Sequence, residues 1–223
     1  MPFTSISLLN IITATMCCVA GLGSAITILR RDINKESLFF SLFLIGLSAH
    51  QIFYAFLLVE GLKELHYPLS TISIAICVTG LYLFSKSLKT KGNITTIDIF
   101  LCSLLFLVPL FCIIFRPYIF ISEPHGYELQ VEPWFLIFYT LFEVSYLAYS
   151  VSLLFKMMLT SHSLKIRRKV KIIIVSLILI AISAILTEVV IPIIFLTHIT
   201  KPVGYLLMGL FMLTMSYAFI EKD

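Results

Sequence analysis

The sequence has 223 residues, of which 60% are hydrophobic and only 13% are charged, and its formal net charge is +4. Soluble domains are about 45–50% apolar and about 25% charged, so no water-soluble core could take up this much apolar surface. The cations form short clusters beside apolar runs and leave no basic domain to hold a duplex, which argues against nucleic acid as a partner. We therefore expect lipid to be the solvent of this chain.

Seven apolar runs, separated by short polar segments, fill the chain. Each provides roughly the 20 residues that an α-helix needs to cross a bilayer, which leaves little sequence for a soluble catalytic domain. The sequence predicts an all-α membrane protein, a single domain over residues 1–223 that forms one seven-transmembrane-helix bundle. In chain order the expected spans are residues 5–29, 38–59, 69–85, 97–115, 134–155, 172–196 and 203–219.

Basic residues fall almost entirely into every second gap between these runs. Of the 16 Lys and Arg residues, only Lys63, Arg116 and Lys201 lie in the other gaps. Short loops rich in Lys and Arg remain in the cytoplasm, which places the N-terminus outside and the C-terminus inside. We expect a multi-pass protein of the cytoplasmic (inner) membrane.

The outer loop before the fifth span contains a hairpin pattern. Two stretches rich in β-branched and aromatic residues, 118–122 and 127–131, flank Glu123-Pro124-His125-Gly126. Pro at the second turn position and Gly at the fourth favour a type I turn, so we predict a small β-hairpin, with an irregular loop as the alternative. Because an isolated hairpin is only marginally stable, it should lean on the bundle as a lid over the outer face.

Pro192 interrupts the sixth span. Its nitrogen cannot donate to the carbonyl of Glu188, four residues earlier, so we expect a kink beside this acidic side chain. In lipid such a freed carbonyl is tolerated only where neighbouring helices or water satisfy it. This stretch should therefore face the bundle interior.

Three ionisable side chains lie deep in the expected spans: His50, Glu143 and Glu188. A charge at the bilayer centre costs about 2.5–3.5 kcal/mol on insertion scales, so such residues usually face inward and find partners. The rise per residue places His50 and Glu143 near the midplane and Glu188 roughly one turn further towards the outside. A shared cluster in the outer half of the bundle is the expected arrangement.

A polar stripe on the fifth span supports a pocket there. Tyr139, Glu143, Tyr146 and Ser150 recur at helical spacing on one face. Two alternatives stay open for these polar groups: they only join neighbouring helices by hydrogen bonds, or they form a proton or ion path. For Trp134 the alternative is an anchor at headgroup depth. The candidate ligand-binding residues are His50, Gln51, Tyr54, Trp134, Tyr139, Glu143, Tyr146 and Glu188.

The sequence carries no motif for catalysis, a cofactor or a metal. It has no phosphate-binding loop, no Gly-x-Ser-x-Gly and no His-Glu-x-x-His. Lys201 precedes the last span, whereas a retinal Schiff base needs a lysine within it. Apart from His50, the histidines fall in expected loops, so no zinc ligand set converges. We expect a protein that is not an enzyme and has neither cofactor nor metal.

The order of several short motifs resembles a known family. Arg30-Arg31 precedes a Phe-rich second span, a basic inner loop covers residues 163–169, Glu188 leads to Pro192, and Pro202-Val203-Gly204 opens the last span. This order is similar to the seven-transmembrane N-terminal sensor region of membrane histidine kinases, most clearly from the fifth span onward. The resemblance implies an outward-facing bundle that senses a ligand and passes helix movement through the last span into a cytoplasmic output.

No phosphoacceptor histidine segment or ATP-binding domain follows Phe219 in this sequence. We therefore expect either an excised or degenerate sensor module, or a stand-alone sensor whose output, a kinase or cyclase, is a separate protein. It would bind a small apolar or amphipathic ligand from the outer side and couple through residues 165–171, and a homodimer stays open. The alternatives are a small transporter or ion-coupled carrier, against which the lack of an internal repeat weighs, and a scaffold subunit of a larger membrane complex.

Overall fold

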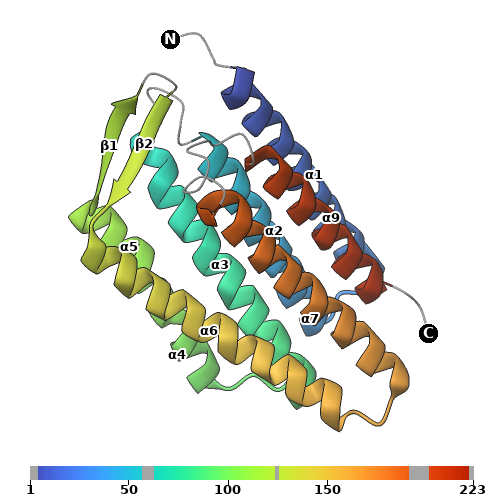
Figure 1. The fold of residues 1–223 in the computed structure, drawn as a ribbon. Helices are drawn as coiled ribbons and strands as arrows, with labels where there is room; N and C mark the ends of the chain where they lie inside the picture. Colours follow the sequence, from blue (N-terminus) through green and yellow to red (C-terminus); the bar gives the residue numbers. More distant parts are fainter. Residues whose placement is uncertain (1–4, 57–62, 124–125, 191–200, 221–223) are drawn as a thin grey trace.

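The computed structural model describes residues 5–56, 63–123, 126–190 and 201–220. Seven helical segments are long and apolar enough to cross a membrane, which confirms the predicted multi-pass class. The elements, shown in Figure 1, are α1 (Ser5–Arg31), α2 (Lys35–Phe56), α3 (Lys63–Thr90), α4 (Thr96–Leu105), α5 (Leu107–Phe115), β1 (Tyr118–Glu123), β2 (Gly126–Val131), α6 (Pro133–Thr160), α7 (Leu164–Ala184), a π-helical segment η1 (Ile185–Val190) and α9 (Lys201–Ile220).

Six of the helices pack in a closed ring. Following the ring, α1 contacts α2, α2 contacts α3, α3 contacts α6, α6 contacts α7, α7 contacts α9, and α9 returns to α1. The pair α4 and α5 packs on α3 from outside the ring (Figure 1). We call the end that carries the β-strands the hairpin end, and the end with the connections at residues 32–34, 91–95 and 161–163 the basic end.

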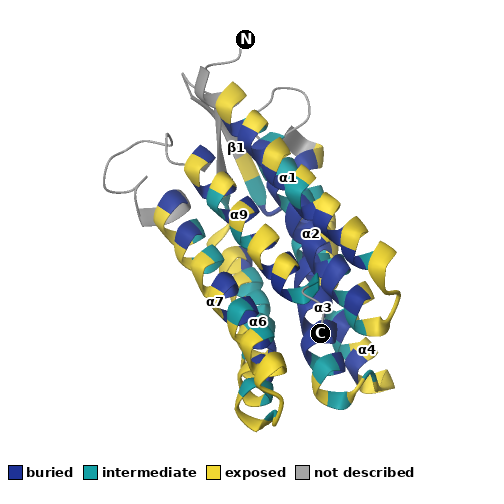
Figure 2. Cartoon of the chain, turned by 90° about the vertical axis from the view of Figure 1, so that its right-hand side faces the viewer, coloured by how far each residue is buried: buried dark blue, intermediate teal, exposed yellow. Residues whose placement is uncertain are grey.

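Burial differs sharply between the helices of the ring. In the most apolar stretch of α3, 72% of the residues are buried inside the protein, against 11% for α6. Figure 2 shows the same contrast, with α3 largely buried and α6 carrying few buried residues. Because seven apolar spans leave α6 with so much uncovered apolar surface, its outer face fits contact with lipid.

Helices α2 and α3 approach more closely than side chains would allow. A Cβ atom at Gly46 would overlap the backbone of Cys77, and one at Gly80 would overlap the backbone of Phe43. Small residues let helix backbones meet in this way inside membranes, where lipid tails remove the hydrophobic force between helices. Two glycines, on opposite helices, therefore set the spacing of this pair.

Two of the predicted spans start too late, because the first turns of these helices are polar and lie outside the apolar run. Helix α3 begins at Lys63 rather than at residue 69, and α7 begins at Leu164 rather than at residue 172. The basic segment before the sixth span is helical, and the Ser163 hydroxyl caps it by accepting the Ile166 N–H at 3.4 Å. A Ser at this position favours a helix start, because its hydroxyl accepts one of the free N–H groups of the first turn.

The fourth span is broken into α4 and α5 at Phe106. Pro109 lies in the first turn of α5 and has no N–H to donate to the carbonyl four residues earlier, so the regular helix cannot continue through this point. The predicted single span over residues 97–115 is thus correct in extent but wrong in being one unbroken helix.

The predicted β-hairpin is present as two antiparallel strands with Tyr118 opposite Val131 and Glu123 opposite Gly126. The expected type I turn lies at residues 124–125, outside the described residues. The expected kink at Pro192 also lies outside them. The six residues before that segment, Ile185–Val190, form a π-helix instead of continuing α7, and such segments are rare and frequently occur at functional sites.

We predict that Gly46→Ala and Gly80→Ala each destabilise the protein by about 1–3 kcal/mol, because each added methyl overlaps the facing backbone and separates α2 from α3. Thermal unfolding of the purified protein in detergent measures the effect. Gly23→Ala is the matched control, since a Cβ atom there meets nothing within 4 Å. Equal stability of the three variants would contradict the close contact.

Candidate functional site

Four tyrosines and one glutamate gather where α2, α3 and α6 meet near the hairpin end. Tyr67 of α3 is buried, and Tyr54 of α2 and Tyr139 of α6 pack against the small core around it. The ring of Tyr118, from β1, meets Tyr67 edge-on with 4.8 Å between centroids. Glu143 lies within electrostatic range of Tyr67. We call these five residues the tyrosine cluster.

Helix α6 holds the polar pair of the cluster in place. Tyr139 and Glu143 are one turn apart, so their side chains lie on one face, close enough to interact electrostatically. Phe135, fully buried one turn earlier, stacks on Tyr139 with 6.1 Å between centroids. Cys77 of α3 is also within electrostatic range of Glu143, so this carboxyl faces α3. The pair thus lies where α6 packs on α3, and both side chains are half-buried.

His50 lies on α2 but is oriented towards α3. Its Nδ1 is 2.8 Å from the Ser70 hydroxyl and 3.2 Å from the Ser70 carbonyl oxygen. The imidazole stacks on Tyr54 with 5.9 Å between centroids. His50 therefore reaches the tyrosine cluster through Tyr54, and its hydrogen-bond partner is a serine.

The other predicted site residues lie in three different surroundings. Gln51 is buried, and its Oε1 has no hydrogen-bond partner among the described residues. Tyr146 donates to the Leu101 carbonyl of α4 at 2.7 Å, which directs it away from the tyrosine cluster. Trp134, at the start of α6, keeps 51% of its surface exposed, the arrangement that an anchor at headgroup depth requires. The Glu188 backbone belongs to η1, and its side chain lies outside what the structure describes.

A buried ionic network that the sequence analysis missed connects α3 to α4 at the basic end. Asp98 is 2% exposed; its Oδ1 accepts from the Tyr82 hydroxyl at 2.6 Å and lies 3.1 Å from the Lys86 Nζ. Its Oδ2 accepts the Thr95 N–H at 2.9 Å and the Thr95 hydroxyl at 2.7 Å. The available signal was Thr95-Thr96-Ile97-Asp98 before an apolar run, the pattern of a capping box.

A cleft of about 1120 Å³ opens at the basic end, inside the ring. All six ring helices contribute to its wall, among them Ile28 of α1, Phe84 of α3, Met157 of α6 and Phe219 of α9. None of the sequence-predicted site residues lines this cleft. The hairpin end and the basic end thus carry two separate candidate sites.

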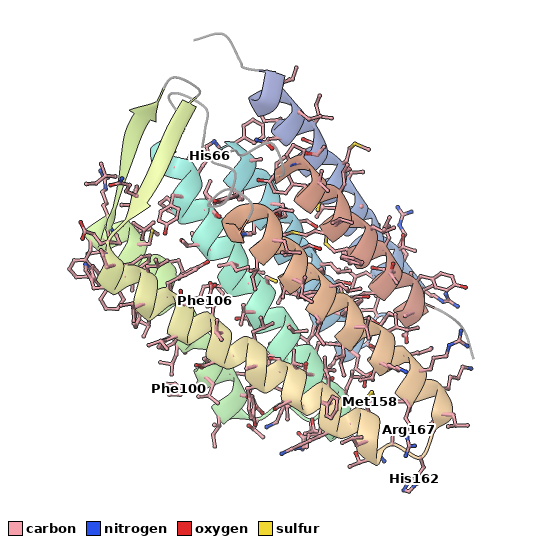
Figure 3. All side chains as sticks on the ribbon, viewed as in Figure 1. His66, Phe100, Phe106, Met158, His162 and Arg167 are labelled. Atoms are coloured by element: carbon pink, nitrogen blue, oxygen red, sulfur yellow. The ribbon has the colours of Figure 1, made fainter. Side chains whose placement is uncertain are left out.

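The tyrosine cluster offers hydroxyls, one carboxyl and aromatic faces, which suit the binding of a small molecule with an apolar body and a few polar atoms. Among the described residues, no group of three or more His, Cys, Asp or Glu converges as a metal site. Figure 3 shows His66 near the hairpin end and His162 at the basic end. His66 belongs to α3, which corrects its assignment to a loop.

Comparison with known protein families gives no matching family model, and comparison with curated proteins gives no match. The resemblance to histidine-kinase sensor regions therefore stays an expectation from the order of short motifs. The site has to be interpreted from its own geometry.

We predict that Asp98→Ala destabilises the protein by about 2–4 kcal/mol, because it leaves the buried Tyr82 hydroxyl without its acceptor and removes the carboxylate that accepts the Thr95 N–H in the α4 capping box. Thermal or denaturant unfolding in detergent measures this loss. The control is Asp32→Ala, which removes an exposed carboxylate near the same end and should change stability by less than about 0.5 kcal/mol. A similar loss in both variants would show that the network contributes nothing specific.

Proposed function

We propose that this protein is a membrane sensor or receptor-like module that binds a small apolar or amphipathic ligand at the tyrosine cluster. Its hairpin end would face the outside and its basic end the cytoplasm, in the cytoplasmic membrane, because Lys and Arg concentrate at the basic end. A separate kinase or cyclase would receive the signal.

The observation that carries this proposal is the polar pair Tyr139 and Glu143, half-buried where α6 packs on α3. An ionisable side chain at membrane depth is costly and is a functional-site hypothesis by default. Gln51 supports the same reading, because its buried Oε1 has no partner in the described part of the protein and could accept a hydrogen bond from a ligand.

The connections of the cluster give a route for a signal. Tyr118 links the cluster to the hairpin, so a ligand that displaces Tyr67 would also move β1. Helix α6 continues from Glu143 to Thr160 and contacts α7, whose first turns carry the basic inner segment. A tilt of α6 at the hairpin end would therefore change the geometry of the connection at residues 161–163.

A transporter is the second candidate function, and the cleft at the basic end favours it. A carrier open to one side needs a cavity that reaches from one membrane face towards a central binding site. Here a cleft lies inside the ring at the basic end, and polar residues lie at the other end.

We predict that a screen of small amphipathic molecules against the purified protein finds a ligand that raises the unfolding temperature by roughly 5–10 °C at saturating concentration. Glu143→Gln and Tyr139→Phe should abolish this shift, because each removes one ionisable or hydroxyl group of the pair while nearly keeping the side-chain volume. Differential scanning fluorimetry with each variant is the measurement.

Glu132→Gln is the matched control, since Glu132 is the exposed residue that directly precedes the same helix. It should keep the full shift. A ligand whose shift survives in both cluster variants would bind elsewhere, and the sensor site would be refuted at this position.

For the transporter, we predict uptake of that same ligand into proteoliposomes above the level of empty liposomes, with loss of uptake in Glu143→Gln. Fluorescence or radiolabel uptake measures it. Ligand binding without uptake under a pH gradient of either sign would eliminate the carrier and leave the sensor.

A further inference from the structure

The cleft at the basic end is bordered by the ends of all six ring helices. Its volume of about 1120 Å³ exceeds the roughly 300–1,000 Å³ typical of sites for drug-sized ligands. An occupant that fills it must be longer than an inorganic ion or a simple metabolite.

The rim of the cleft is basic. Its described lining includes two acidic residues, Asp32 and Glu36, and five basic ones: Arg31, Lys89, Lys91, Lys165 and Lys169. Ser161 and Ser163 add hydroxyls to the same rim, and Ser163 caps the first turn of α7, a helix of 21 residues. The positive end of that helix dipole adds to the cationic field. The rim therefore complements an anion that accepts several hydrogen bonds.

The floor of the cleft is apolar and aromatic. Phe84 of α3 and Phe219 of α9 line it, with 5.9 Å between their ring centroids, and each ring lies 4.9 Å from Phe40 of α2. Leu88 and Ile173 extend this surface. An anion bound at the rim alone would leave the apolar floor exposed to water, which is unfavourable. The site therefore suits an occupant with a charged head and a hydrocarbon part.

We propose that this cleft binds an anionic phospholipid from the leaflet at the basic end, with its phosphate on the lysine rim and an acyl chain against the phenylalanine floor. Basic pockets between membrane helices take anionic headgroups through this combination of charge and depth. The lipid would join helices α1, α3, α7 and α9, which are distant in sequence. The site is independent of the ligand proposed for the tyrosine cluster.

Lys165 and Lys169 also interact within the protein, so the test uses Lys89 and Lys91, two exposed cations on the cleft rim. The double variant Lys89→Gln/Lys91→Gln is compared with Lys156→Gln/Arg168→Gln, which removes the same charge from exposed positions outside the cleft. Each protein, in neutral detergent, is titrated with dioctanoyl phosphatidylglycerol, dioctanoyl phosphatidylcholine or inorganic phosphate. The unfolding temperature and native mass spectrometry are the readouts.

Phosphatidylglycerol should raise the unfolding temperature of the unchanged protein in a saturable way and remain bound as one molecule per protein, whereas phosphatidylcholine and phosphate should do neither. The cleft variant should need about tenfold to thirtyfold more phosphatidylglycerol, and the control variant should match the unchanged protein within about twofold. Equal weakening in both variants would show diffuse surface attraction and overturn the proposal. Equal effects of phosphate and phosphatidylglycerol, or of the two lipids, would overturn it as well.

Discussion

The direct backbone contact between α2 and α3 is the constraint on which the rest of the bundle depends. Gly46 and Gly80 face the partner backbone with no side chain between. This approach holds His50 against Ser70 and brings α2 and α3 together where the tyrosine cluster forms. Lipid does not press helices together as water does, so association in a membrane rests on such close packing and on polar contacts.

Helix α3 carries two polar centres, and α6 takes part in both. Near the hairpin end, Tyr67 meets the pair on α6; towards the basic end, Tyr82 binds Asp98 and meets the ring of Tyr146 edge-on at 5.9 Å. Polar groups in an apolar medium are stable only when they find each other. The two helices are thus aligned at two heights, which fixes both the separation and the rotation of α6 on α3.

Composition and charge were enough to predict the spans, since hydrocarbon imposes the length of each apolar run, and turn residues predicted the hairpin. The break at Phe106 was recoverable from Pro109. The direction of the Tyr146 side chain could not be predicted, because helical spacing places residues on a common face but does not say which neighbouring helix that face contacts. Asp98 was overlooked although a capping-box pattern marked it, because its partners Tyr82 and Lys86 lie on another helix and the sequence does not say which faces of α3 and α4 meet.

Closure of the ring has a consequence for biosynthesis. The first and last helices of the ring are packed together, with Gly209 of α9 against Cys17 of α1, and Ala14 and Met212 belong to the same core. A chain is made from its N-terminus, so this face of α1 stays unpaired in the membrane until α9 has been inserted. During that interval the ring is not yet closed. If synthesis stalls before Lys201, the exposed face of α1 can pack against the α9 of another copy, which is a domain swap.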